Sequence, residues 1–313
     1  MLDDAERVIR FKIREIVFRP RASPFRWEFI QYSPFNYDVQ QQQPTQAETQ
    51  AAATYPDIHG ETASVPTTAT HVPLQPQMIR CIDIREENKF VKTFKFETKT
   101  PPNNLPGQFA TFELNIQGKR IIRTWTVSSV PKSDSDCSLA ITVKRLPHGI
   151  ASNWLHDELH IADEIKLKLI DGEFSPFSRD SPERFQRLLL LAGGIGITPL
   201  MSMMRGLFVN NIPCDVSLIF SARSAEDIIF RQELDEMATR QNCMIHYTVT
   251  QPDSTWRGCT GRINAEMIMT AAPDLKRRVV FMCGPPLFLK DMSVLLAQLG
   301  LPSENLRLER FDF

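Results

Sequence analysis

Residues 188–200 read Leu-Leu-Leu-Leu-Ala-Gly-Gly-Ile-Gly-Ile-Thr-Pro-Leu. Five apolar residues that end in glycines are typical of a strand buried on both faces of a parallel sheet. The glycines predict a tight turn, and the helix that follows is expected to be capped by Thr198 and opened by Pro199. Such a turn presents backbone N–H groups to an anion, although plain strand-to-helix turns share the same pattern. The stretch therefore indicates an α/β fold.

The same pattern of an apolar strand followed by a helix continues to the C-terminus. Apolar segments lie at 216–220, 244–249 and 279–282, and helical patterns lie near 227–240, 263–271 and 286–299. This alternation predicts a parallel sheet covered by helices, in which ligands bind beyond the carboxyl ends of the strands. Residues 283–286, Cys-Gly-Pro-Pro, form a second strand-to-helix turn that we expect to face the same crevice. By itself, Cys283 fits a buried core residue equally well.

Residues 78–175 show short runs of period two instead. The runs are 78–84, 89–97, 109–116, 121–128, 139–144 and 165–169, separated by Pro, Asn, Gly and Asp. About six short strands at this spacing predict an antiparallel barrel or sandwich. The sequence thus predicts two domains, an antiparallel β-barrel over 77–180 and an α/β parallel-sheet nucleotide-binding domain over 181–313.

The N-terminal quarter differs from both predicted domains. Residues 38–76 are rich in Gln, Thr and Pro and contain no Lys or Arg. Such a tract buries too little apolar surface to offset its ordering entropy, so it is expected to be a disordered linker. Residues 1–37 form a segment of unknown fold. Its stretch 7–14 alternates apolar and basic residues, which suggests a strand or a short docking element.

Composition excludes several classes of protein. The chain has 313 residues with 36 basic and 37 acidic side chains, so its net charge of −1 offers no bulk attraction for nucleic acid or anionic membrane. No run approaches about 18 apolar residues, so no membrane span is expected. The six cysteines form no Cys-x-x-Cys pair. This argues against a metal site and fits reduced thiols in a cytoplasmic protein.

Two motifs of the predicted barrel suit a phosphorylated ligand. Residues 123–129 read Arg-Thr-Trp-Thr-Val-Ser-Ser at a strand end. Unless a bend intervenes, alternation places Arg123, Trp125 and Val127 on one face and Thr124, Thr126 and Ser128 on the other. Residues 143–155 predict a strand, a turn at Gly149 and a helix capped near Ser152, which is a second anion-ready helix start. Exposed strands and ordinary turns also show such patterns.

From about residue 78 to Phe313 the chain resembles the ferredoxin–NADP reductase superfamily. The resemblance rests on six motifs in order, at 106–109, 123–129, 149–152, 171–174, 193–199 and 283–286. Within the superfamily, the Cys-Gly-Pro-Pro variant and the region 227–234 are most similar to cytochrome b5 reductases and to hybrid-cluster or oxygenase reductases. The resemblance implies that the barrel binds a flavin and that the sheet domain binds a nicotinamide nucleotide.

The resemblance assigns roles to the barrel residues. Arg123 and Ser152, with the helix start at 150–152, would bind the flavin pyrophosphate. Trp125 falls at the family's tyrosine, which packs on the isoalloxazine ring. An indole keeps the aromatic face but not the phenolic hydroxyl. Thr126 would contact flavin N5.

On the nicotinamide side, the resemblance places Cys283 beside C4 and Thr198 near the pyrophosphate or amide. The C-terminal Glu309-Arg310-Phe311 resembles the Glu-x-Tyr ending of plant-type members. By this resemblance Phe311, or else Phe313, would shield the flavin. A last strand that packs Phe311 into the core is equally compatible with the sequence. The expected catalytic residues are Thr126, Cys283, Glu309 and Phe311, without a metal. The expected cofactor-binding residues are Arg123, Thr124, Trp125, Thr126, Val143, Lys144, Gly149, Ile150, Ala151, Ser152, Gly194, Thr198, Ser221, Arg223, Asp227, Cys283, Gly284, Pro285 and Phe311.

The resemblance also bears on which cofactors bind. The Gly-x-x-Ser motif and its spacing from Arg123 favour FAD over FMN. Asp227 matches an acid that disfavours the 2′-phosphate of NADPH by charge repulsion. Ser221 and Arg223 would instead hold that phosphate. The balance leans slightly to NADH.

The expected function is that of a flavin-dependent NAD(P)H oxidoreductase that passes a hydride from nicotinamide to FAD, and then electrons to a separate redox acceptor such as a ferredoxin or cytochrome. No cluster-type cysteine spacing follows Phe311, so the acceptor is expected to be external. One alternative is a non-catalytic flavin- or nucleotide-binding regulatory or assembly subunit of the same fold. Another is a structural protein whose essential part is residues 1–76, which would tether a partner.

Overall fold

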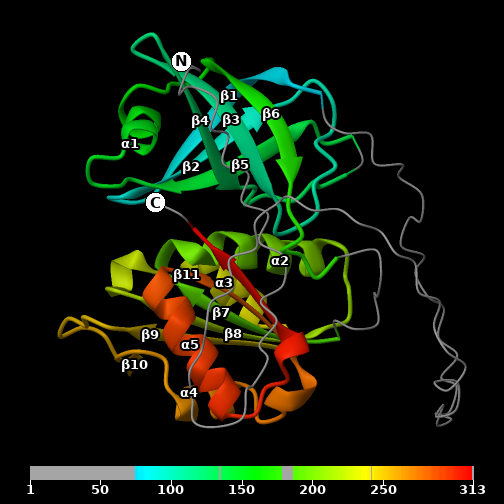
Figure 1. The fold of residues 1–313 in the computed structure, drawn as a ribbon, viewed down its shortest axis with the longest axis vertical. Coiled ribbons are helices and arrows are strands. Elements are labelled where there is room, and N and C mark those ends of the chain that lie inside the picture. Colours follow the sequence, from blue (N-terminus) through cyan, green and yellow to red (C-terminus); the bar gives the residue numbers. More distant parts are fainter. Residues whose placement is uncertain (1–74, 134, 178–185, 241, 312–313) are drawn as a thin grey trace, which may run out of the picture. The chain divides into compact units, whose positions relative to one another are not determined.

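The computed structural model describes residues 75–133, 135–177, 186–240 and 242–311 (Figure 1). All of them belong to one compact unit. The predictions for the segment 1–37 and for the linker 38–76, except for its last two residues, lie outside the described residues, as does Phe313.

The first sheet is antiparallel and has six strands. These are β1 (Gln77–Asn88), β2 (Val91–Glu97), β3 (Phe109–Ile116), β4 (Lys119–Thr126), β5 (Ser138–Lys144) and β6 (Glu164–Asp171). The strand order is β4-β3-β6-β1-β2-β5, and a bridge between Val127 and Ile141 joins the end of β4 to β5. The two edge strands therefore meet and close the sheet around a core that contains Phe94, Phe96 and Phe112. The predicted antiparallel barrel is confirmed.

Helix α1 (Ile150–Asp157) packs Ala151 and Leu155 into the barrel core. The predicted cap near Ser152 is wrong, because the helix starts directly after Gly149 and has no side-chain cap. The hydroxyl of Ser152 instead accepts a hydrogen bond from the Leu146 N–H at 3.2 Å. A Cβ at Gly149 would lie 2.5 Å from Ser152 Oγ and 2.9 Å from Leu146 Cβ, so a larger residue at the helix start would force these side chains to move.

The second sheet is parallel. Its strands are β7 (Arg187–Gly193), β8 (Asp215–Ala222), β9 (Cys243–Val249), β10 (Cys259–Thr260), β11 (Val279–Gly284) and β12 (Leu306–Arg310). The order is β10-β9-β8-β7-β11-β12. Leu188 to Ala192 in β7 have no exposed surface, as expected for a strand that is covered on both faces. The predicted parallel-sheet domain is confirmed.

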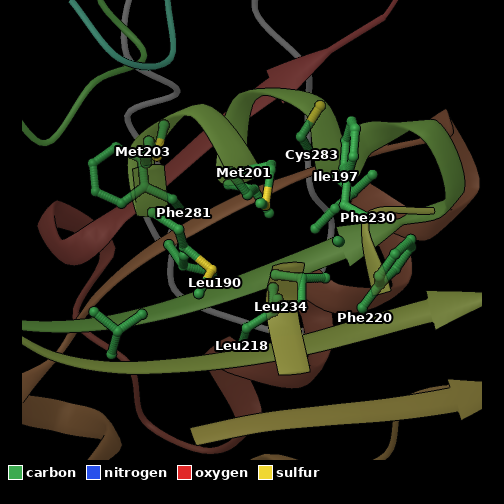
Figure 2. Packing of buried hydrophobic residues seen from close by; sticks show 14 of the residues in the cluster. Leu190, Ile197, Met201, Met203, Leu218, Phe220, Phe230, Leu234, Phe281 and Cys283 are labelled. Atoms are coloured by element: carbon green, nitrogen blue, oxygen red, sulfur yellow. The ribbon is translucent and has the colours of Figure 1, made fainter. Parts of the chain in front are cut away.

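Helices cover both faces of this sheet (Figure 1). They are α2 (Ile197–Val209), α3 (Arg231–Ala238), α4 (Ala265–Ala271) and α5 (Pro286–Gln298), and short 3₁₀ turns lie at η2 (Gly194–Gly196), η3 (Ala225–Asp227), η4 (Leu275–Arg277) and η5 (Ser303–Asn305). Leu190 packs on the α2 and α3 side, with Ile197 and Met201 above it (Figure 2), whereas Leu189 packs on the opposite side. Within the described part of the chain, no helix has the length and apolarity needed to cross a bilayer.

Helix α2 starts earlier than the sequence predicted. Its first residue is Ile197, after Gly196, so the predicted cap at Thr198 is wrong. The η2 turn runs directly into the helix, and Gly196 already has near-helical angles, with φ −61° and ψ −4°. Thr198 lies inside the first turn, where its Oγ1 donates to the Ile195 carbonyl at 3.1 Å.

Candidate functional site

The two glycine turns meet at one edge of the parallel sheet. Strands β7 and β11 are neighbours, with Ala192 opposite Cys283. A Cβ at Gly196 would lie 2.2 Å from the Cys283 carbonyl oxygen, and a Cβ at Gly284 would lie 3.1 Å from the Gly193 Cα. The backbones of the two motifs thus approach closely, and at position 196 only glycine fits without a shift of the Cys283 backbone. The two turns thus lie against each other, and a crevice that both face stays a prediction.

Cys283 and Glu309 stand opposite each other in the β11–β12 register. Cys283 is fully buried, and burial raises the pKa of its thiol, with a smaller contribution from Glu309. Glu309 is half-buried as a residue, but its Oε2 is sealed from solvent and has no hydrogen-bond partner among the described residues. Burial raises the pKa of this carboxyl to about 8. Near neutral pH the Cys283 thiol and the Glu309 carboxyl are therefore largely uncharged. Glu309 Oε2 is left to hydrogen-bond with a ligand.

Thr126, the last residue of β4, holds a second unpartnered atom. Its side chain is 6% exposed, and its Oγ1 is buried without a partner among the residues the structure describes. Thr126, Val127 and Ser128 are all buried, so the alternation predicted for this segment ends here. The reason is the closure of the barrel, because Val127 bridges to β5 and the Ser128 N–H donates to the Ala140 carbonyl at 2.8 Å.

The other residues of the 123–129 motif are more open. Arg123 and Thr124 are exposed, and Arg123 Nη1 donates to the Ile122 carbonyl at 2.8 Å. Within the described ranges Arg123 has no carboxylate partner, so its charge is available to an anion. Trp125 is half-buried, and its ring centroid lies 5.6 Å from that of Phe112. Part of the indole therefore belongs to the barrel core.

The second anion-ready segment follows β5. Val143 is buried and Lys144 half-buried, and the strand leads through the turn at Gly149 to helix α1. Ile150 is exposed at the start of this helix, while Ala151 and Ser152 are buried. Because no side chain caps α1, its first backbone N–H groups are left for an anion.

The barrel segment contacts the helix that begins at the glycine turn. The Gly107 N–H donates to Ser202 Oγ of α2 at 3.3 Å, and this hydroxyl donates to the Ser129 carbonyl at 3.4 Å. The rings of Phe174 and Phe281 pack edge to face with their centroids 5.3 Å apart. The structure therefore connects the Thr126 end of the barrel to the Cys283 end of the sheet through α2 and β11.

Part of the loop after β8 is held by hydrogen bonds within the loop itself. Asp227 Oδ2 accepts hydrogen bonds from the Ser224 N–H at 3.2 Å and from its hydroxyl at 3.0 Å, which caps η3. Arg223 is exposed and, among the described residues, has no carboxylate partner; Ser221 is half-buried. A cavity of about 440 Å³ lies beside this loop and is lined in part by Ala225, Arg231, Tyr247 and Trp256.

The remaining predicted residues line the sheet's carboxyl edge. Gly194 has φ +55° and open space where a Cβ would lie, and Thr198 is buried. Pro285 is exposed at the start of α5. Phe311 follows the last strand, is half-buried and packs against the cluster that contains Cys283, so both interpretations of this residue stay predictions.

One family model matches the barrel and another matches most of the parallel-sheet domain. Residues 79–175 match the oxidoreductase FAD-binding domain, and residues 190–293 match the oxidoreductase NAD-binding domain. NADH-cytochrome b5 reductase 1 of Mortierella alpina is 32% identical over 209 residues, which are 64% of this chain and 67% of that protein. The chain belongs to the ferredoxin reductase superfamily.

Other members add detail. The glycine betaine monooxygenase reductase subunit of Pseudomonas aeruginosa PAO1 is 37% identical over 239 residues, covering 75% of this reductase-family chain but only 64% of the relative's length. A ferredoxin NADP⁺ reductase from Neisseria gonorrhoeae, solved with FAD and NADP, superposes with a TM-score of 0.63 at 19% identity, over 76% of this chain and 99% of that one. The similarity to the Neisseria gonorrhoeae structure supports the fold. Membership of the family confirms the predicted oxidoreductase class with FAD and NAD domains.

The reductase-family chain offers groups that fit a flavin. Among the described residues, four buried side-chain atoms lack hydrogen-bond partners, namely Asn104 Oδ1, Thr126 Oγ1, His246 Nε2 and Glu309 Oε2, and Thr126 and Glu309 belong to the predicted site. Arg123 is an uncompensated cation there, and the first turn of α1 is uncapped. Buried polar atoms without partners are rare in folded proteins, so these two are consistent with a bound ligand that completes them.

Sequence reasoning missed Arg205 of α2, which contacts both domains. The signal was present, because Arg205 is the one charged residue in the mostly apolar segment Ile197–Val209. A lone arginine in such a helix predicts a paired, partly buried charge.

Proposed function

We propose that this chain is an FAD-dependent NAD(P)H reductase that delivers electrons to a separate redox protein. The observation that supports the proposal best is the contact between the Thr126 end of the barrel and α2, the helix whose start lies against Cys283. This contact supports one shared site for the predicted flavin motif and the predicted nicotinamide motif.

In this proposal, bound FAD would supply the chemistry that takes a hydride from the nicotinamide donor and passes electrons one at a time to the acceptor. The buried Thr126 hydroxyl, which has no partner among the described residues, would hydrogen-bond to the flavin ring. Arg123 and the uncapped start of α1 neutralise the pyrophosphate. Trp125 and Phe311 offer aromatic faces to the ring system.

Cys283 and Glu309 act on the nicotinamide side. Their burial excludes water, and their largely neutral state suits a neutral dihydropyridine ring. Glu309, largely protonated near neutral pH, would offer its unpartnered Oε2 and its carboxyl proton as hydrogen-bonding groups to the bound nucleotide.

Anaerobic stopped-flow mixing tests the proposal. Full-length protein loaded with FAD is mixed with NADH, and the flavin absorbance is expected to fall within seconds. Protein that binds flavin but is reduced by neither NADH nor NADPH would contradict the reductase proposal and favour the non-catalytic subunit.

The acceptor is proposed from the relatives' names. One group is named as reductase subunits of a monooxygenase, and another as reductases of cytochrome b5. An oxygenase component or a small cytochrome is therefore the proposed partner class. The domain limits, the cytoplasmic location and any role of residues 1–76 stay predictions from the sequence.

We expect the enzyme to prefer NADH over NADPH, because the Asp227 carboxylate repels a 2′-phosphate. Asp227→Asn removes the charge and keeps an oxygen that can accept from Ser224, so η3 is preserved. The variant is expected to gain about tenfold in kcat/KM for NADPH, the scale of one close charge pair in a wet site. Steady-state rates with both nucleotides measure the change, and Glu226→Gln in the same turn is the control. Wild-type preference for NADPH would refute the prediction.

A further inference from the structure

Arg205 makes three contacts from the third turn of α2. Its Nη1 donates to the Ser128 carbonyl at 2.6 Å. Its Nε and Nη2 donate to the two carboxylate oxygens of Glu233 at 2.8 and 2.6 Å. Its guanidinium carbon lies 4.8 Å from the ring centroid of Phe230. The Arg205 side chain is only 16% exposed, whereas that of Glu233 is 36% exposed, so the arginine is largely shielded and the carboxylate is partly open to solvent.

These contacts join three parts of the proposed site. Ser128 follows Thr126 by two residues, at the flavin end of the barrel. Phe230 and Glu233 belong to the start of α3, just after the loop of Asp227. Arg205 itself lies on α2, which starts against Cys283. Since a helix rises about 1.5 Å per residue, Gly196 and Arg205 are separated by roughly 14 Å along a rigid rod.

The backbone of Phe230 and the ion pair with Glu233 both have specific geometries beside Arg205. Phe230 has φ +60° and ψ 15°, a left-handed conformation that is uncommon for a bulky residue and is kept only where its surroundings hold it. The forked pair with Glu233 requires the planar guanidinium, because a lysine ammonium cannot make both bonds in that geometry. The Ser128 N–H and hydroxyl are already bonded to β5, so its carbonyl moves only with the barrel end.

We propose that Arg205 is a positioning residue that sets the distance between the Thr126 end of the barrel and the Cys283 end of the sheet. The inference rests on the proposed function, in which flavin and nicotinamide stack between these ends. Hydride transfer requires a close, aligned pose, and a displacement of about 1 Å can lower its rate by roughly 100-fold. Loss of Arg205 should therefore slow the transfer without removing any group that touches either cofactor.

The test compares Arg205→Ala, Arg205→Lys and Glu233→Gln in the full chain. The control is Arg262→Ala, which removes an exposed ion pair with Asp291 (3.3 Å). Arg205→Ala is expected to lower the rate constant for flavin reduction by NADH about 10- to 100-fold, with flavin content and NADH affinity within about threefold of wild type. Arg205→Lys should be intermediate. Glu233→Gln should be milder because the Ser128 contact survives. The deuterium isotope effect with 4-deuterated NADH should change in Arg205→Ala and not in the control.

Hydrogen exchange supplies a readout that needs no turnover. Amides at 127–130 are expected to exchange faster in Arg205→Ala than in wild type or Arg262→Ala. Unchanged exchange, or a rate constant within about threefold of wild type, overturns the proposal. If Arg205→Ala does not fold, the same criteria apply to Arg205→Lys. If the wild type itself is not reduced, the proposed function fails, while hydrogen exchange still decides whether Arg205 holds this segment.

Discussion

Gly196→Ala is expected to lower the rate of flavin reduction by NADH about 100-fold. The added Cβ would lie 2.2 Å from the carbonyl oxygen and 2.4 Å from the carbonyl carbon of Cys283, and 2.7 Å from the Gly284 nitrogen. All three are backbone atoms that cannot rotate away. To remove this clash, the Cys283 turn must shift by roughly 1 Å, which displaces the nicotinamide site. The overpacking is expected to lower the stability of the protein by about 1–3 kcal/mol. Stopped-flow reduction and urea unfolding measure the two effects.

The matched control is Gly118→Ala in the β3–β4 turn. There an added Cβ meets nothing within 4 Å, although φ is +76°. A cost of about 1 kcal/mol from the backbone conformation and a wild-type rate are expected. Gly196 has φ −61°, which any residue adopts, so its larger effect must come from the contact with Cys283. A wild-type rate in Gly196→Ala would show that this contact does not position the site.

Glu309→Gln is expected to change the pH dependence of stability. The pKa of Glu309 is raised from 4.5 to about 8 by burial in the folded protein. Between these values the unfolded chain loses this proton and the folded protein keeps it, so rising pH lowers the free energy of unfolding until about pH 8. Glutamine stays neutral and removes this loss. At pH 9 the variant is expected to be more stable by about 2–5 kcal/mol, with little difference at pH 4.

Unfolding at a series of pH values checks this expectation, with the exposed Glu304→Gln as control. The rate of flavin reduction should also change near pH 8 in the wild type and be flat there in Glu309→Gln. Equal stability differences at pH 4 and pH 9 would show that the carboxyl is not held protonated by burial.

Most of the fold was predictable because its signals are local. The leucines at 188–191 indicate a strand covered on both faces, and they pack alternately into the two clusters on either side of the sheet. The barrel strands were recognised from period-two runs, and β3 matches its predicted range, Phe109–Ile116. The two-residue strand β10 is too short to leave a pattern.

The site was predictable only as a set of motifs. The caps at Ser152 and Thr198 were wrong because glycine backbone turns start both helices, and hydroxyls at these positions bond to neighbouring turns instead. That Gly196 must be glycine follows from its contact with Cys283, far along the chain, which no local pattern reveals. The role of Arg205 likewise depends on a carbonyl in the other domain.

A crystal structure of the FAD-loaded protein tests the central claim most directly. The account predicts that the isoalloxazine ring lies between the Thr126 end of the barrel and the Cys283 end of the sheet. Thr126 Oγ1 should lie within hydrogen-bond distance of the N5 edge of the ring, and Cys283 should lie on the side of the ring where nicotinamide binds. A ring bound elsewhere, with Thr126 Oγ1 still unpartnered, would contradict it.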